Sequence, residues 1–269
     1  MSQFSEEEAS VAKHYDDSAF DYECARLPRD CPVEMGVTLR WLKRVAKPGD
    51  VVVEIGVGGG HYTEFLARLG CRLHLVDVTA RLLDAVTARL RQAGLGDRID
   101  GCHHVSGTYL EGLVSQSADI VLLMGPLYHL RSLDDRRRAV LESARILKRG
   151  STLFAAGINR LSYLRDLLRL KFGSITERVA FHEQYLRDGN LDPEHAPPIG
   201  YAHLTTIAEF GELFENGFEK LAMLGTESFT MSWQDDWKSK SPEDQAFWLD
   251  IVEATGTTVE GMAYSDHFL

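Results

Sequence analysis

The sequence predicts an α/β fold in which helices cover both faces of a mostly parallel sheet. Short β-branched runs alternate along the chain with segments of helical apolar spacing, which is typical of βαβ units. The first run, residues 51–55, leads into a glycine loop at 56–60 that opens a helix. The second run, residues 71–77, ends in an acid, Asp77. This order of strand, glycine loop, helix and acid predicts a ligand site at the carboxyl edge of the sheet.

Local signals predict the elements in chain order. A capping box formed by Ser5 and Glu8 begins a helix that runs to about residue 15. A helix at 33–46 ends at a turn, 47–50. The strands are expected at 51–55, 72–76, 99–105, 119–124 and 151–157, and the intervening helices at 61–69, 79–94 and 134–150. In the last of these helices acids come first and bases last, which suits the helix dipole.

The alternation breaks after residue 157. Residues 158–205 intervene before a second capping box, Thr206 with Glu209, begins a helix that ends near residue 217. Within this insertion, residues 160–171 have a helical apolar face. Because the insertion follows the fifth strand at the ligand edge, we expect it to form a substrate cap, and the alternative is a packing embellishment.

The C-terminal region is expected to complete the sheet. Two strand-like runs, 221–229 and 261–269, are predicted to pair as an antiparallel hairpin, with a helix at 242–254 between them. The whole chain, 1–269, is expected to be a single domain.

Composition narrows the class of protein. The net charge of −11 disfavours nucleic acid as a partner, and no apolar run is long enough to span a membrane. An acidic N-terminus without a signal peptide and four scattered cysteines favour a cytoplasmic protein. Neither the His103–His104 pair nor the His182–Glu183 pair has the spacing of a metal site, so no metal is expected.

Two nucleoside cofactors compete for the glycine loop. The dinucleotide fingerprint would need its third glycine at His61, whereas the observed pattern is Glu54 followed by glycine at 56, 58 and 60. An acid at Asp77 lies about where a ribose would present its hydroxyl groups. A nicotinamide-dependent oxidoreductase and a glycine-rich turn without any ligand remain as alternatives.

Several segments together resemble one family. They are VVVEIGVGGGHY at 51–62, LVDVTARLLD at 75–84, DIVLLMGPLYHL at 119–130, ARILKRGSTLFAAGINR at 144–160, YECARLPRDCPVEMGVTLRWL at 22–42 and YAHLTTIAEFGELFENGF at 201–218. They resemble class I S-adenosylmethionine (SAM) methyltransferases, in particular a bacterial small-molecule group with a Gly-Pro-Leu-Tyr-His-Leu motif. The resemblance implies a Rossmann-like sheet of seven strands, mostly parallel with an antiparallel last strand. It also implies SAM as cofactor and S-adenosyl-L-homocysteine as product.

The resemblance also implies roles for individual residues. Residues 1–46 would form a helical cover over the cofactor, and Asp77 would bind the ribose. The cofactor-binding set would be Tyr15, Tyr22, Arg26, Glu54, Gly56, Gly58, Gly60, Asp77, Val78, Ser106, Gly107, Thr108, Leu123 and Met124. Ordinary helix packing is the alternative for the two tyrosines, and a surface ion pair for Arg26. The turn at 105–108 departs from the family, because it has hydroxyl groups where an acid near the adenine is usual.

The chemistry requires orientation above all, since a sulfonium methyl group is already a strong electrophile. A hydroxyl or ammonium acceptor also needs a base. His129 is the first candidate, with Tyr128 beside it, and His203 is the second. The alternative for each histidine is a hydrogen-bonded structural role.

We therefore expect a SAM-dependent methyltransferase, monomeric or homodimeric, that methylates nitrogen or oxygen of a small molecule by in-line displacement. The acceptor would bind between the 158–205 insertion and the end of the fourth strand, near Tyr128, His129, Tyr201, His203, Leu164, Leu168 and Phe172. A non-catalytic SAM sensor or partner subunit, and a methyltransferase acting on RNA or protein, are the alternatives.

Overall fold

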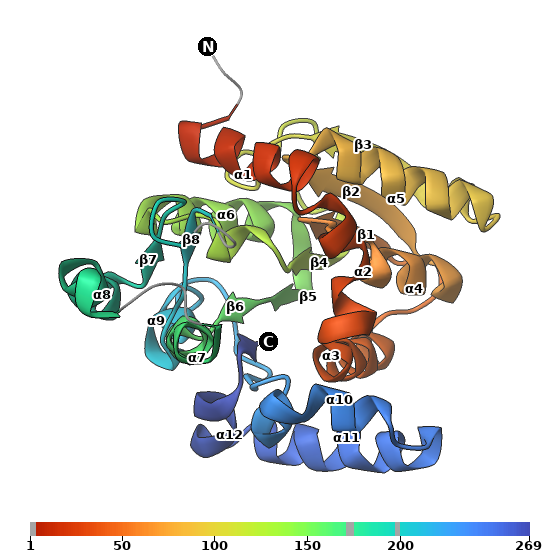
Figure 1. Cartoon of the computed structure of the whole chain (residues 1–269). Coiled ribbons are helices and arrows are strands. Elements are labelled where there is room, and N and C mark those ends of the chain that lie inside the picture. Colours follow the sequence, from red (N-terminus) through yellow and green to blue (C-terminus); the bar gives the residue numbers. More distant parts are fainter. Residues whose placement is uncertain (1–3, 171–174, 197–199) are drawn as a thin grey trace.

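Five parallel strands form the central sheet of the computed structural model, which describes residues 4–170, 175–196 and 200–269 (Figure 1). In chain order they are β1 Val51–Ile55, β2 Arg72–Asp77, β3 Ile99–His104, β4 Ala118–Leu123 and β5 Leu147–Ala155. Their order across the sheet is β3-β2-β1-β4-β5, so β1 lies at the centre. The strand order reverses beside β1, and this is where a doubly wound sheet opens a crevice for ligands.

Both faces of the sheet are buried, as the β-branched runs predict. Val52 packs on one face and Val53 and Ile55 on the other, because successive side chains of a strand alternate. The first face is covered by α3 Pro32–Val45, α4 His61–Leu69 and α5 Ala80–Gln92, and the second by α6 Leu133–Ile146 and α9 Ile207–Glu212. Short 3-10 turns, η1 Gly96–Arg98 and η2 Pro126–Tyr128, precede β3 and follow β4.

Two N-terminal helices lie beside the carboxyl edge of the sheet (Figure 1). The first, α1 Glu6–Asp17, has the predicted capping box between Ser5 and Glu8. The second, α2 Phe20–Asp30, has no side-chain cap and contains a proline, Pro28, so no local signal predicts it. None of the helices in the described part of the chain has the length and apolar character that a bilayer span needs.

The insertion at 158–205 has a small apolar core of its own around Tyr163 and Tyr185. Its elements are α7 Arg160–Leu170, η3 Ile175–Glu177, α8 Val179–Asp188 and a short antiparallel pair, β7 Asn190–Leu191 with β8 Ala202–His203. Residue 171 of the predicted helix and Phe172 of the predicted acceptor wall lie outside the described residues. The role of this insertion as a substrate cap stays a prediction.

The C-terminal region of the described chain does not complete a seven-stranded sheet, although the two predicted runs do meet. Gly225 pairs antiparallel with Phe268, and Leu224 and Leu269 exchange backbone hydrogen bonds. The segment after residue 225 forms η4 Ser228–Trp233, α10 Gln234–Lys238, α11 Pro242–Gly256 and α12 Val259–Tyr264. Thr258 caps α12 by accepting from the Gly261 backbone, which turns the second run into a helix. Only its last residues are extended, where β9 His267–Phe268 pairs antiparallel with β6 Gly157–Ile158 outside the main sheet.

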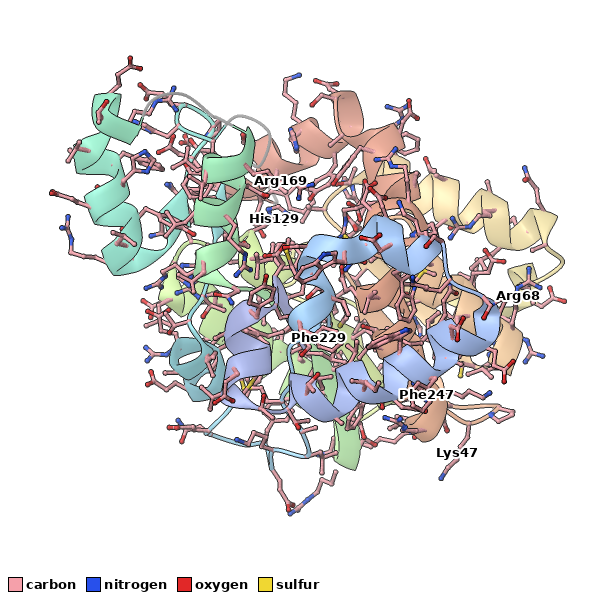
Figure 2. The ribbon with its side chains drawn as sticks, turned by 60° about the horizontal axis from the view of Figure 1, so that its bottom comes forward. Lys47, Arg68, His129, Arg169, Phe229 and Phe247 are labelled. Atoms are coloured by element: carbon pink, nitrogen blue, oxygen red, sulfur yellow. The ribbon has the colours of Figure 1, made fainter. Side chains whose placement is uncertain are left out.

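The C-terminal helices form a layer against α3. Leu249 of α11 lies over Gly36, where a Cβ atom would come within 3.2 Å of its side chain. The opposite side of α11 remains open, with Phe247 65% exposed and Phe229 of η4 beside the same helix (Figure 2). One face of α11 therefore packs on α3, while the side that carries Phe247 is exposed.

A buried ionic network joins this layer to the N-terminal helices. The Nδ1 atom of His267 lies 2.5 Å from Glu227 and 3.5 Å from Glu34. Glu34 in turn pairs with Arg26 at 3.3 Å. Burial alone would lower the pKa of His267, but the carboxylates of Glu34 and Glu227 raise that pKa to about 9. The network thus stabilises the fold through a protonated histidine.

We predict that His267→Gln lowers the free energy of unfolding by about 3 kcal/mol near pH 6, because it leaves the buried Glu227 carboxylate without its cation and Glu34 with Arg26 alone. The folded wild type holds one more proton than the unfolded chain between pH 6.5 and about 9, so this stabilisation is present below pH 6.5 and is lost as pH rises through 9. In urea unfolding, the difference in free energy of unfolding between the wild type and His267→Gln should be smaller at pH 9.5 than at pH 6.

His182→Gln is the matched control. Neither ring nitrogen of His182 has a hydrogen-bond partner among the described residues, and burial lowers its pKa. The effect of His182→Gln on the free energy of unfolding should therefore change little between pH 6 and pH 9.5. An equal His267→Gln gap at both pH values would contradict the role of the protonated imidazole.

Candidate functional site

A pocket at the carboxyl edge of the sheet collects residues from five separate stretches of the chain. Its floor is the glycine loop between β1 and α4, and one side is the β2–α5 turn with Asp77, Val78 and Thr79. The other side is the segment after β4, from Met124 to Leu130. The helices α1 and α2 lie over it and supply Glu8, Val11, Tyr15, Glu23, Arg26 and Leu27. The pocket is therefore built where the sheet topology predicts a ligand site.

Glycine is required in the floor for two reasons. Gly56 has φ +82°, and a Cβ atom there would lie 3.1 Å from the Cα atom of Gly125, so the ends of β1 and β4 can touch only without side chains. Gly58 has φ +47°, and its Cβ would lie 2.6 Å from the Glu23 carboxylate. The absence of a side chain at Gly58 thus lets Glu23 of α2 approach the loop closely.

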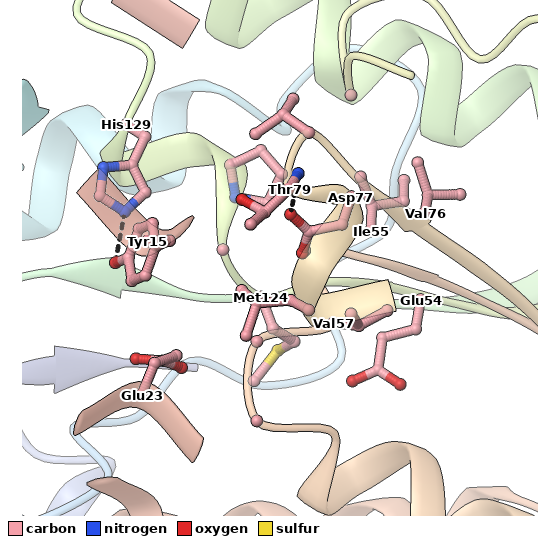
Figure 3. Close-up of a pocket in the computed structure, with 18 of the residues that line it drawn as sticks. Tyr15, Glu23, Glu54, Ile55, Val57, Val76, Asp77, Thr79, Met124 and His129 are labelled. Carbon is pink, nitrogen blue, oxygen red and sulfur yellow. Dashed lines mark hydrogen bonds between the residues drawn. The ribbon is translucent and has the colours of Figure 1, made fainter. Parts of the chain in front are cut away.

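Two acids of the pocket are fully buried. Burial raises the pKa of Glu54 to about 8, although Thr63 donates to its Oε2 atom at 2.5 Å. Burial also raises the pKa of Asp77 to about 6, against hydrogen bonds from the backbone of Thr79, which donates at 2.8 Å, and of the glycine loop. Figure 3 shows Asp77 and Glu54 on opposite sides of Val57. A cationic or hydroxyl-bearing ligand would satisfy both carboxylates.

A polar contact across the pocket joins α1 to the segment after β4. The hydroxyl of Tyr15 lies 3.0 Å from Nε2 of His129, and the two rings meet edge to face (Figure 3). The other ring nitrogen, Nδ1, lies 3.0 Å from the Tyr201 carbonyl, which can only accept. Nδ1 therefore carries the hydrogen, and Nε2 offers a lone pair to the Tyr15 hydroxyl.

Burial keeps both groups neutral. It lowers the pKa of His129 to about 4 and raises that of Tyr15 well above 10. At neutral pH the pair is thus an uncharged phenol that donates to an uncharged imidazole.

Arg26 lies at the same end of the pocket, but it is already paired. Its guanidinium lies 3.2 Å from Glu23 and 3.3 Å from Glu34, and it is largely buried. Its assignment to a cofactor carboxylate stays a prediction.

The structure gathers most of the predicted site residues but not all of them. Those that line the pocket are Tyr15, Arg26, Glu54, Gly56, Gly58, Gly60, Asp77, Val78, Gly107, Met124, Tyr128 and His129. Tyr22 is 48% exposed beneath Arg29, and Leu123 is packed in the core below the pocket. Ser106 and Thr108 are bonded to each other and are not among the lining residues, and His203 is hydrogen-bonded to Asn190 in the insertion.

Several lining residues were missed from the sequence. Glu8 was considered only as part of a capping box, although its spacing from Val11 and Tyr15 places all three on one helix face. Glu23 and Glu34 gave no signal, because their approach to Arg26 depends on how α2 and α3 pack.

The comparisons with known proteins agree with this geometry. Residues 53–155 match the methyltransferase domain family. The chain is 33% identical over 120 residues to ubiquinone biosynthesis O-methyltransferase of Xanthomonas campestris pv. campestris (strain B100), which is 44% of this chain and 46% of that protein. It thus spans about half the length of this relative.

Two further comparisons cover more of the fold. The chain is 31% identical over 187 residues, 64% of its own length and 77% of the relative, to ubiquinone biosynthesis O-methyltransferase of Aromatoleum aromaticum (strain DSM 19018 / LMG 30748 / EbN1). The solved structure of geranyl diphosphate C-methyltransferase from Streptomyces coelicolor A3(2) has a TM-score of 0.57 at 11% identity, covering 94% of this chain and 95% of that one, which shows the fold alone. This chain belongs to the SAM-dependent methyltransferases, whose cofactor is S-adenosyl-L-methionine.

Proposed function

We propose that this protein transfers the methyl group of SAM by in-line displacement to oxygen or nitrogen of a small molecule. The hydrogen bond between Tyr15 and His129 at the pocket carries the proposal, because it supplies a proton acceptor where a methyl acceptor would lie. The sulfonium of SAM, when bound, supplies the electrophilic methyl group.

The pocket residues fit this cofactor. Asp77 is a buried carboxylate at the end of β2, where two ribose hydroxyls could donate to it. Glu23 and Arg26 present a carboxylate and a guanidinium side by side over the glycine loop. This pair is complementary to the ammonium and carboxylate of an amino acid, so the methionine end would lie there.

The proton of the acceptor would leave through Tyr15. As an acceptor hydroxyl donates to the Tyr15 oxygen, Tyr15 passes its own hydrogen to the lone pair of His129 Nε2. The acceptor then gains one methyl group and loses one proton, Tyr15 is unchanged, and His129 becomes an imidazolium held by Tyr201. The Tyr15–His129 bond also ties α1 to the segment after β4, which would help to exclude water from the site, as orientation-based catalysis requires.

A ring hydroxyl is the first acceptor to test. The relatives above are named as O-methyltransferases, and Tyr128 and His129 offer aromatic surfaces at the pocket. Incubation of the protein with SAM and a panel of phenols and amines, followed by mass spectrometry, would detect the added methyl group. Tight SAM binding with no product from any small molecule would favour the sensor, the partner subunit or a macromolecular substrate instead.

We predict that Asp77→Ala weakens binding of S-adenosyl-L-homocysteine by about 1–3 kcal/mol, because a buried charged acceptor is lost. For the wild type, affinity should also fall as the pH drops through about 6, where Asp77 becomes protonated, and this dependence should be absent in Asp77→Asn. Titration calorimetry measures both effects.

Asp100→Ala is the control for this prediction. Asp100 lies on the neighbouring strand β3 but pairs with Arg72 outside the pocket. Its loss should leave affinity unchanged. Equal affinities of Asp77→Ala and the wild type would remove Asp77 from the ribose site.

We predict that His129→Ala lowers turnover by roughly 10²–10⁴-fold while cofactor affinity stays nearly intact, because the proton acceptor is lost and the cofactor contacts remain. Tyr15→Phe should change turnover in the same direction and shift the pH profile. Turnover is measured with an acceptor found in the panel.

Tyr109→Phe, which removes a hydroxyl from a 64% exposed ring outside the pocket, should have no effect. If His129→Ala and Tyr15→Phe both lose less than a few-fold, the pair is structural and proximity alone drives the reaction.

A further inference from the structure

Glu8 lies at the end of the pocket opposite Arg26 and its partners Glu23 and Glu34. We propose that Glu8 of α1 recognises the 6-amino group of the cofactor's adenine and so selects the base. This assignment depends on the proposed placement of SAM with its ribose at Asp77. The helix α1 would then contribute directly to recognition of the adenine.

An apolar slot adjoins Asp77 at this end. Val78 lines it from the β2–α5 turn, Leu82 from α5, Val105 from just after β3, and Val11 from α1. A flat purine attached to a ribose at Asp77 would extend into this slot and lie between aliphatic side chains. Glu8 lies on the same face of α1 as Val11, one turn earlier, and lines the same pocket.

Hydrogen bonds fix the orientation of the Glu8 carboxylate. The Ser106 hydroxyl donates to its Oε1 atom, and the Ser5 backbone donates to Oε2 at 3.0 Å. Ser106 is itself held by Thr108, whose backbone donates to the Ser106 oxygen at 3.0 Å. A carboxylate has about four lone-pair sites, so two accepted bonds leave room for an amino group.

The other acids of the pocket have different partners. Asp77 is the acid assigned to the ribose, and Glu54 lies on the opposite side of Val57 from it (Figure 3). Glu23 and Glu34 both pair with Arg26. The turn after β3 has no carboxylate, since residues 105–108 read Val-Ser-Gly-Thr. Among the acids that line the described pocket, Glu8 is therefore the one placed to accept from the base.

The test compares two ligands that differ at position 6 of the purine. S-adenosyl-L-homocysteine has an amino group there, and S-inosyl-L-homocysteine has a carbonyl oxygen, which cannot donate to Glu8. By calorimetry the wild type should prefer the adenosyl ligand by about ten- to a hundredfold, the worth of one hydrogen bond to a charged group. In Glu8→Ala the preference should fall below about threefold.

Glu8→Gln keeps the size of the side chain and provides the same test of ligand preference if the alanine variant folds poorly. Its amide can donate to the carbonyl of the inosyl ligand, so the preference should shrink or reverse. Retention of the wild-type preference in either folded variant would overturn the inference.

Two controls separate recognition of the base from closure of α1. Glu7→Ala removes the ion pair of the same helix with Arg131, and Ser5→Ala removes the reciprocal half of the capping box. Both should bind the two ligands with the wild-type ratio. A ratio that collapsed equally in these controls would show that Glu8 acts only by holding α1, and would overturn the inference.

An error in the placement of the cofactor can be told apart from an error in the role of Glu8 by the affinities of the wild type for the two ligands. If the wild type bound neither ligand, the placement of the cofactor would be wrong and the inference with it. If it bound both equally well, the cofactor would stand and only the role of Glu8 would fall.

Discussion

The contact between Gly56 and Gly125 is the constraint on which the pocket depends. The loops that leave β1 and β4 meet there at backbone distance, and a Cβ atom on either glycine would lie 3.1–3.3 Å from the other's Cα atom. This approach sets the direction in which α4 departs and the height at which Pro126, Tyr128 and His129 stand above the sheet. A side chain at either position would separate the two halves of the site before any catalytic residue was altered.

Above this floor the protein has concentrated charge that is costly to bury. Burial raises the pKa values of Glu54 and Asp77, whereas Glu34 and Glu227 are paired with Arg26 and His267. Glu54, Asp77 and Glu34 line the pocket, and Glu34 also meets His267 and Glu227 at the junction of α3 with the C-terminal layer. The acids thus differ in whether a cationic side chain is paired with them, and those paired with a cation join parts of the fold.

The sequence allowed the sheet to be predicted closely and the cover only in outline. The strands at Val51–Ile55 and Arg72–Asp77 were expected within a residue, because β-branched runs between turn residues are a local signal. The caps at Ser5 and Thr206 were correct for the same reason. The runs at 221–229 and 261–269 pair only at 224–226 and 267–269, because Glu227 and Ser265 bond to each other and the flanking segments are helical, which apolar alternation does not show. Pairs such as Tyr15 with His129, 114 positions apart, depend on packing that no local pattern encodes.

The hydrogen bond from His129 to the Tyr201 carbonyl links the insertion to the protonation chemistry of the pocket. The two residues are 72 positions apart, yet this one bond decides which nitrogen of the ring has the hydrogen. If a bulky acceptor moved the backbone at Tyr201, the imidazole would be released to its other tautomer and would present N–H instead of a lone pair to Tyr15. The shape of the bound molecule would then determine, through the insertion, whether His129 has a lone pair that can accept a proton.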